Sequence, residues 1–298
     1  MTSTTSIETT ATFGVSFIQI KAAGAAEGVT RQAIVIDNDL SKTVVALNGA
    51  HVMSFVPKGK PDLLWMSPNS DIVAGKPIRG GIPLCLPWFG PGAEGTPMHG
   101  FARIVDWAVA GVEATAEGAT KVTLVLADTA ESRASWPFAF AATLELVCGT
   151  DLEMKLSFEN KSTEAQRVEF AYHTYFNVGD VSQIRIEGLD GLDGIDRLAG
   201  DAPIRQEGIK TIDGATTHYY SGIPDCLYID SPNGRIKIAG DQKSAMVWNP
   251  GEGAANVPDM GEGAQVGFVC VERVDAIDTA VTLEPSATYT ADMTIGWC

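Results

Sequence analysis

Two ionisable side chains stand inside apolar, strand-like runs of this sequence. His173 lies in "EFAYHTYFNV" (Glu169–Val178), and Glu272 lies in "GFVCVERV" (Gly267–Val274). An imidazole can give or take a proton near neutral pH, and a carboxylate in apolar surroundings is costly to bury unless it is paired or lines a cleft. We therefore expect general acid–base chemistry if the two share a pocket. A hydrogen-bonded structural histidine and a structural ion pair at Glu272 are the alternatives.

The alternation of side chains along a strand gives each group a face. Extended backbone puts His173 on one face together with Glu169, Ala171 and Tyr175. The other face consists of Phe170, Tyr172, Thr174 and Phe176. The aromatic face should be buried, so His173 should look out from the opposite one. By the same rule Glu272 shares a face with Phe268 and Cys270, and Arg273 points to the other face.

A glycine- and proline-rich stretch, "KPIRGGIPLCLPWFGPGAEGTPMHGFAR" (residues 76–103), carries a local positive charge. The stretch contains three basic residues, Lys76, Arg79 and Arg103, and a single acidic residue, Glu94. Arginine suits bidentate capture of a phosphate or carboxylate, so the stretch predicts an anion site on a well-defined loop. Ordinary surface ion pairs are the alternative. His99, beside Gly100, is a further candidate because glycine lets a ligand approach the backbone closely.

The elements that must position these residues are strands. Short β-rich segments bounded by polar residues or glycine recur along the chain, and "LEMKLSF" alternates with Leu152, Met154, Leu156 and Phe158 on one face. Helical periodicity is scarce, and the best candidate, "DTAESRASW", is short. The pattern predicts an all-β fold of antiparallel sheets packed face to face, in a single domain over residues 1–298. Residues 1–15 are expected to form a polar N-terminal tail.

Composition narrows the classes of function. The 298 residues carry a formal net charge of −16, which is the wrong sign for a nucleic-acid or anionic-membrane binder. The five cysteines include no CxxC pair, so neither a zinc site nor a disulfide framework is indicated, and we expect reduced, mostly buried thiols in a cytoplasmic protein. No apolar run is long enough to span a membrane. GxGxxG, GxxxxGK[ST], HExxH and GxSxG are absent.

The order of "RGGIPLCLPWFG", "HGFAR", "FAYHTYFNVGD", "PDCLYID", "VWNP" and "VCVE" resembles the hexose-6-phosphate mutarotases, a branch of the aldose 1-epimerases. The resemblance runs from about Arg31 to the C-terminus. It implies a β-supersandwich of the galactose-mutarotase type and interconversion of α and β anomers of a hexose 6-phosphate, glucose 6-phosphate first. It also implies a small sugar phosphate as partner, no metal or redox cofactor, and a monomer or weak dimer.

The resemblance assigns roles to particular residues. His173 is implied as the general acid and Glu272 as the general base. The remaining site residues are implied to hold the sugar and its phosphate, and they are Arg79, His99, Arg103 and Asp225. Two departures from the family pattern stand out. Arg273-Val274 follows "VCVE" where relatives commonly have Pro-Gly, which would change the loop after the base or add a charge near the cleft. Met98 precedes "HGFAR" where some relatives carry a polar residue, which concerns the sugar specificity.

Three other functions fit parts of the sequence. An aldose 1-epimerase for unphosphorylated sugars would use the same acid–base pair without the arginines. A carbohydrate-binding β-sandwich without catalysis would need aromatic stacking, for which Trp88, Trp107 and Trp248 are available. A structural or regulatory protein could retain the same fold, since a fold does not fix a function.

Overall fold

The computed structural model of this chain describes residues 5–6, 14–22 and 30–298. The expected N-terminal tail lies mostly outside the described residues. Within it, β1 (Thr5–Ser6) pairs with β2 (Val15–Ile20). No helix in the described part is long and apolar enough to cross a membrane.

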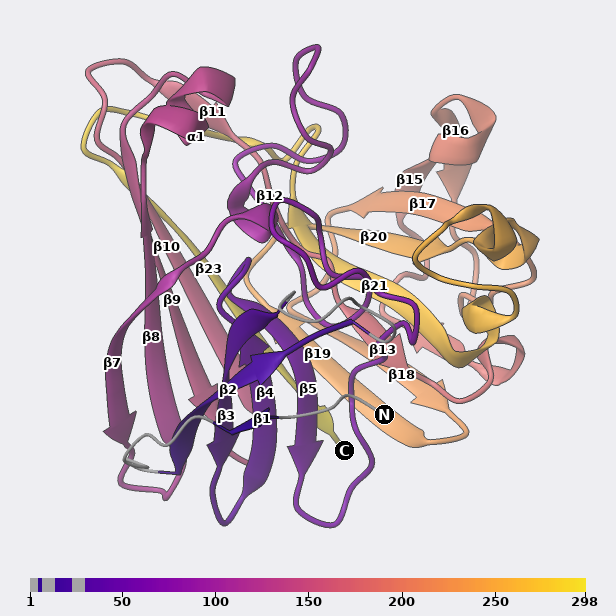
Figure 1. Cartoon of the computed structure of the whole chain (residues 1–298). Helices are drawn as coiled ribbons and strands as arrows, with labels where there is room; N and C mark the ends of the chain where they lie inside the picture. Colours follow the sequence, from indigo (N-terminus) through magenta and orange to yellow (C-terminus); the bar gives the residue numbers. More distant parts are fainter. Residues whose placement is uncertain (1–4, 7–13, 23–29) are drawn as a thin grey trace.

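The fold consists of antiparallel sheets, as the sequence predicts (Figure 1). The N-terminal five-stranded sheet runs in sequence order through β1, β2, β3 (Arg31–Asp37), β4 (Ser41–Ala46) and β5 (His51–Pro57).

The outer eight-stranded sheet brings together strands from residue 108 to residue 297. Its spatial order is β14 (Arg185–Glu187), β18 (Cys226–Ser231), β19 (Gly234–Gly240), β23 (Thr288–Trp297), β10 (Leu152–Asn160), β9 (Phe140–Cys148), β8 (Thr120–Ala127) and β7 (Ala108–Ala114).

The central sheet carries the candidate site. Its order is β16 (Ala202–Arg205), β15 (Asp193–Asp196), β17 (Thr216–Ser221), β20 (Ser244–Asn249), β21 (Phe268–Asp275), β12 (Phe170–Tyr172) and β6 (Leu84–Cys85), and β13 (Tyr175–Asn177) also pairs with β21. A separate two-stranded ribbon joins β11 (Gln166–Val168) to β22 (Val281–Leu283).

Helices are few and short in the described part of the chain. The expected helix is α1 (Ala130–Ser135), which begins with a capping box in which Thr129 and Ser132 exchange hydrogen bonds with each other's backbone. The 3-10 turns are η1 (Ala102–Ile104), η2 (Val181–Gln183), η3 (Arg197–Ala199), η4 (Gly251–Asn256) and η5 (Ala264–Gly267).

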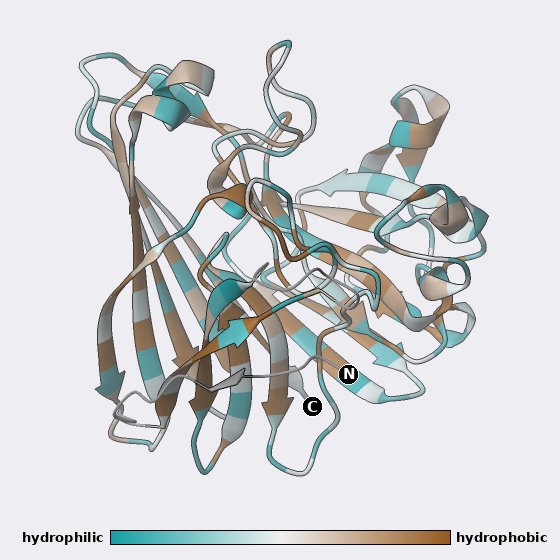
Figure 2. Cartoon of the chain, viewed as in Figure 1, coloured by the Kyte–Doolittle hydropathy of each residue, from teal (hydrophilic) through white to brown (hydrophobic). Residues whose placement is uncertain are grey.

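One large hydrophobic cluster joins the three main sheets, with Ile34 of β3, Leu144 of β9 and Val271 of β21 among its members. The alternation predicted in β10 is confirmed, because Leu152, Met154, Leu156 and Phe158 are buried in this cluster. Figure 2 shows the same pattern as alternating apolar and polar residues along the long strands. Strand β21 differs, since all eight of its residues are buried and both of its faces are covered. A charged residue in β21 is therefore inside the protein on either face.

Candidate active site

Strand pairing places His173 directly opposite Glu272. The chain pairs with β21 on both sides of His173, through Tyr172 with Arg273 and through Tyr175 with Cys270, and the register is the same in both pieces. The distance from His173 Nδ1 to Glu272 Oε1 is 3.4 Å. The two candidates from distant parts of the chain therefore form one cross-strand pair.

The ladder of backbone hydrogen bonds to β21 is interrupted at His173. His173 N donates to Pro83 O at 3.0 Å, and Thr174 N donates to Tyr172 O at 2.8 Å, so β12 ends and β13 begins two residues later. The single strand that the sequence predicts is therefore interrupted at His173. The predicted faces are nevertheless confirmed, since Phe170, Tyr172 and Phe176 lie in the main core.

His173 is less exposed than the sequence suggests. Its exposed fraction is 8% because the face that it shares with Tyr175 is itself covered. The imidazole stacks on the Tyr175 ring at 4.9 Å with an interplanar angle of 5°, and the edge of Trp248 packs against it at 5.9 Å. This packing holds the ring plane in one orientation toward Glu272.

The pair lies in a cavity of about 300 Å³, a volume at the small end of the range for ligand sites. The cavity is lined by Arg79, Phe89, Gly90, His99, Glu169, His173, Arg197, Thr217, Met246, Trp248, Glu272 and Ile277. These residues come from the central sheet, from the loops on both sides of β6, and from the segments that follow β15 and β21, so the fold assembles the cavity from residues that are far apart in sequence.

Burial sets the protonation of the pair. It raises the pKa of Glu272 well above its usual value, with the Arg103 cation acting in the opposite direction. Burial also lowers the pKa of His173, and the positive charges of Arg103 and Arg79 lower it further. Loss of all protons would leave a buried anion, and a second proton would leave a buried cation, so one proton shared by the two groups is favoured.

Two buried polar atoms of the pair have no hydrogen-bond partner among the described residues. They are His173 Nδ1 and Glu272 Oε2. Buried polar groups are normally hydrogen-bonded, and those left unpaired are expensive to keep. A ligand with hydroxyl groups would satisfy them.

His99 adds a neutral hydrogen-bond donor to the cavity. Its Nδ1 accepts from Gly90 N at 3.1 Å, so the ring proton is on Nε2. Burial and the nearby charges of Arg103 and Arg79 lower the pKa of His99 to about 3, so it stays neutral. The ring packs edge-on against His173 with 5.7 Å between ring centres. His99 can therefore donate to a ligand oxygen beside the acid–base pair.

Arg79 is held in the cavity wall by two hydrogen bonds. Its Nε donates to Asp259 Oδ1 and its Nη1 to Tyr175 OH, both at 3.1 Å. The glycines after Arg79 are required by the chain path, since Gly81 has a φ of +59° and a Cβ there would collide with Val52 O. Arg79 is thus a fixed cation on the same side of the sheet as the pair.

Comparison with known proteins identifies this arrangement. The family model for aldose 1-epimerase matches residues 32–296. This chain belongs to the aldose 1-epimerase family. Its resemblance to that family, first recognised from scattered motifs, is thereby confirmed, and the protein is an isomerase.

Individual relatives agree with the family. A protein of Escherichia coli K12 named "Putative glucose-6-phosphate 1-epimerase" is 37% identical over 264 residues, covering 85% of this chain and 87% of the relative. The crystal structure of a "putative mutarotase (YeaD)" from Salmonella typhimurium has a TM-score of 0.84 and 28% identity, covering 94% of this chain and 92% of that one.

The fold is also shared more widely. A "galactose mutarotase related enzyme" from Lactobacillus acidophilus has a TM-score of 0.70 at 16% identity, covering 89% of this chain and 97% of the other. The predicted galactose-mutarotase-like fold is confirmed.

Two expected site residues of this epimerase do not reach the cavity. The η1 turn buries Arg103, whose Nη2 donates to Met98 O at 2.8 Å, and its charge acts on the pair from outside the lining. Asp225 is exposed in the loop between β17 and β18, where its charge acts on Arg273. Arg273 points away from the face that carries Glu272, and Asp225 is not among the residues that line the cavity.

The two departures from the family pattern do not alter the cavity lining. Arg273 continues β21 and is fully buried on the opposite face, where its Nη1 donates to Pro224 O at 2.9 Å and its Nη2 to Gln242 O at 3.0 Å. Met98 is exposed and absent from the lining.

Sequence reasoning gave no role to seven residues that line the cavity of this epimerase: Arg197, Glu169, Met246, Phe89, Gly90, Thr217 and Ile277. Arg197, at the start of η3, contributes a second arginine and pairs with Asp201 at 3.1 Å. Glu169 faces the cavity while it accepts hydrogen bonds from Phe89 N and Arg167. Its strand face was predicted, but no role was attached to it. Met246 lies opposite Glu272 in β20. Nothing in the sequence around Arg197 signals its position, because η3 is the turn that connects β15 to the edge strand β16.

The tryptophans considered for a binding module are scattered. Trp107 is buried in the core and donates to Ala102 O, so it cannot stack on a ligand. Trp88 lines a different hollow, and Trp248 lines the cavity. The described residues thus offer one tryptophan next to the acid–base pair.

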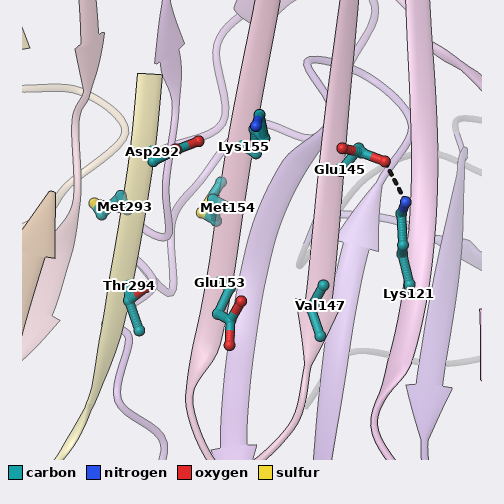
Figure 3. A pocket seen from close by; sticks show the side chains of 9 residues that line it. All are labelled: Lys121, Glu145, Val147, Glu153, Met154, Lys155, Asp292, Met293 and Thr294. Carbon is teal, nitrogen blue, oxygen red and sulfur yellow. Dashed lines mark ion pairs between the residues drawn. The ribbon is translucent and has the colours of Figure 1, made fainter. Parts of the chain in front are cut away.

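A second hollow lies on the outer face of the eight-stranded sheet and carries no comparable chemistry (Figure 3). Neighbouring strands contribute alternating charges there: Lys121 of β8, Glu145 of β9, Lys155 of β10 and Asp292 of β23. Lys121 and Glu145 form an ion pair, and Lys155 lies opposite both Glu145 and Asp292 in the register. Opposite charges in this pattern stabilise a sheet surface.

Proposed function

We propose that this epimerase interconverts the α and β anomers of a hexose 6-phosphate, with glucose 6-phosphate as the preferred substrate. The observation that carries the proposal is the cross-strand pair of His173 and Glu272, 3.4 Å apart in a cavity that also holds Arg79 and Arg197. The pair supplies a proton donor and a proton acceptor to the two oxygens bonded to C1 of the sugar. The arginines supply positive charge for an anionic tail.

The proposed step moves one proton in each direction. Glu272 takes the proton of the C1 hydroxyl while His173 gives a proton to the ring oxygen, and the bond from C1 to the ring oxygen breaks. Rotation about C1–C2 in the free aldehyde presents the other carbonyl face, and the reverse transfers close the ring. General acid–base catalysis contributes roughly 10²–10⁴-fold per group.

The one-proton state of the pair suits this step. An ionised Glu272 beside a protonated His173 and a neutral carboxyl beside a neutral imidazole contain the same number of protons. Binding of a sugar hydroxyl to the carboxylate and of the ring oxygen to the imidazole would favour the charged form. The pair would then act without exchanging protons with solvent before each turnover.

The substrate phosphate would bind between the two arginines of the lining. Arg79 is fixed by Asp259 and Tyr175, whereas Arg197 is on an exposed turn with a side chain that is 35% exposed. An anion held by a rigid and an adjustable guanidinium is positioned without taking part in the reaction. Arg103 would act on the pair through its charge. His99 would hold a sugar oxygen, and Asp225 has no part in this proposal.

Both lining arginines already have carboxylate partners, which favours a second candidate, an unphosphorylated aldose. Arg79 pairs with Asp259 and Arg197 with Asp201. The two candidates are separated by measuring anomer exchange of glucose 6-phosphate and of glucose by NMR at equal enzyme concentration. We expect the higher kcat/KM for the phosphate. An equal or higher kcat/KM for glucose would overturn the choice of substrate.

A further inference from the structure

A thiol lies beside the acid–base pair and has no part in the proposed reaction. Cys270 is two residues before Glu272 on the same face of β21 and is fully buried. One ligand atom each from His173, Cys270 and Glu272, namely a ring nitrogen, Sγ and a carboxylate oxygen, lie within 4.8 Å of one another. An imidazole nitrogen, a thiol and a carboxylate are the donors that zinc takes in proteins.

His173 and Glu272, the two groups beside the thiol, each have a buried polar atom that makes no hydrogen bond to a described residue. His173 Nδ1 and Glu272 Oε2 are buried without a hydrogen-bond partner among the described residues, and the two residues are 8% and 1% exposed. Apart from the 3.4 Å contact between Nδ1 and Oε1, the two side chains contribute no hydrogen bond at these atoms within the described part of the chain, and they converge on one place.

The spacing fits a tetrahedral ion. Bonds of about 2.0–2.2 Å from zinc to nitrogen and oxygen put those two atoms roughly 3.4 Å apart at a tetrahedral angle, and Nδ1 and Oε1 are 3.4 Å apart. The sulfur needs a bond of about 2.3 Å, and Sγ of Cys270 lies within 4.8 Å of the other two ligand atoms.

We propose that His173, Cys270 and Glu272 form a zinc-binding site that inhibits the enzyme, with the fourth coordination position open to the cavity. His173 and Glu272 line that cavity, so the ion enters by the same route as the sugar. Binding releases the thiol proton of Cys270 and the proton shared by the pair, and leaves three ligands on the metal. The inhibitory effect rests on the proposed function, because an ion on both groups blocks the proton transfers, whereas the binding itself does not.

The softness of the donors selects the ion. A thiolate and an imidazole favour Zn²⁺ over Mg²⁺ and Ca²⁺, which take oxygen ligands. Co²⁺ can replace Zn²⁺ in such a site and reports the bond to sulfur through a thiolate charge-transfer band. Millimolar Mg²⁺ should neither bind there nor inhibit.

The test uses the full chain with Cys226→Ser and Cys298→Ser, which removes the two thiols that are not fully buried. Zn²⁺ affinity is measured by competition with a chromophoric chelator, and Co²⁺ by its absorption spectrum. We expect one equivalent of metal, a thiolate band, and at least tenfold weaker Zn²⁺ binding in Cys270→Ala. Cys85→Ala is the matched control, since Cys85 is also a buried thiol but lies in β6 and outside the cluster.

Equal Zn²⁺ affinity in Cys270→Ala and its parent, or a cobalt complex without a thiolate band, would refute the site. Inhibition is measured against the metal-free rate of each variant and should follow the affinity. Because the binding measurements need no turnover, an enzyme that binds zinc at Cys270 but epimerises no sugar would refute the proposed function and leave the metal site standing.

Discussion

Glu272 and Arg273 are adjacent in β21, fully buried, and directed to opposite faces of the central sheet. Glu272 faces the cavity, whereas Arg273 reaches the carbonyls of the loops before β18 and after β19. A single strand thus carries a reactive charge on one side and a structural charge on the other. The two functions can be separated by mutation.

Removal of the structural charge should lower stability and leave the chemistry in place. Arg273→Met leaves the carbonyls of Pro224, Gly240 and Gln242 without their donor, which costs about 3 kcal/mol or more of unfolding free energy. Urea unfolding followed by circular dichroism measures the loss. Arg205→Met, at an exposed arginine that pairs with Asp193, is the control and should change little. A loss below about 1 kcal/mol for Arg273→Met would contradict the structural role.

Removal of the reactive charge of Glu272 should lower the rate of the reaction and leave the stability of the fold in place. Glu272→Gln and His173→Asn should each lower kcat/KM for anomer exchange by roughly 10²–10⁴-fold, and the double variant should lose less than the product. Glu272→Gln should not destabilise the fold, because it removes a buried ionisable group. Glu169→Gln changes another cavity carboxyl, one that is held by Arg167, and should keep most of the rate. A full rate in Glu272→Gln would exclude the carboxylate as the base.

The sequence predicted the strand faces because alternation is a local property. The aromatic side of β12 and β13 and the face shared by Phe268, Cys270 and Glu272 follow from the two-residue repeat. That His173 stands opposite Glu272 depends on strand register, which no local pattern specifies between segments about a hundred residues apart. The family resemblance, and not the spacing, supplied that pairing.

The loop residues were harder to place. Arg103 and Asp225 have the expected chemistry, but the η1 turn buries Arg103, the loop between β17 and β18 leaves Asp225 exposed, and neither lines the cavity. Arg197 shows the converse, since its neighbours in the sequence are ordinary and only the η3 turn brings it to the cavity. Charge counts within one segment cannot reveal which side chains meet across the fold.

The pH dependence should report the shared proton. If both groups had their ordinary pKa values, His173 would lose its proton above pH 6.5 and the rate would fall. Burial instead raises the pKa of Glu272 and lowers that of His173, so the pair loses its proton at the raised pKa of the carboxyl and not at the ordinary pKa of a histidine. We expect kcat/KM to stay level through pH 6.5. The acid limb, where a second proton binds, should lie well below that value. A rate that halves near pH 6.5 and keeps falling would show that the pair titrates as two independent groups.

Arg197 should govern the preference for the phosphate. Arg197→Ala removes the adjustable cation of the cavity and should lower kcat/KM for glucose 6-phosphate at least tenfold, with little change for glucose, because the acid–base pair is untouched. Arg79→Ala should be less selective, since it also releases Tyr175, on which His173 stacks. NMR exchange rates for both sugars measure the ratio, and Arg205→Ala is the surface control. If Arg197→Ala lowered both sugars equally, Arg197 would be acting on the reaction centre or on the fold, and the phosphate would have to bind elsewhere.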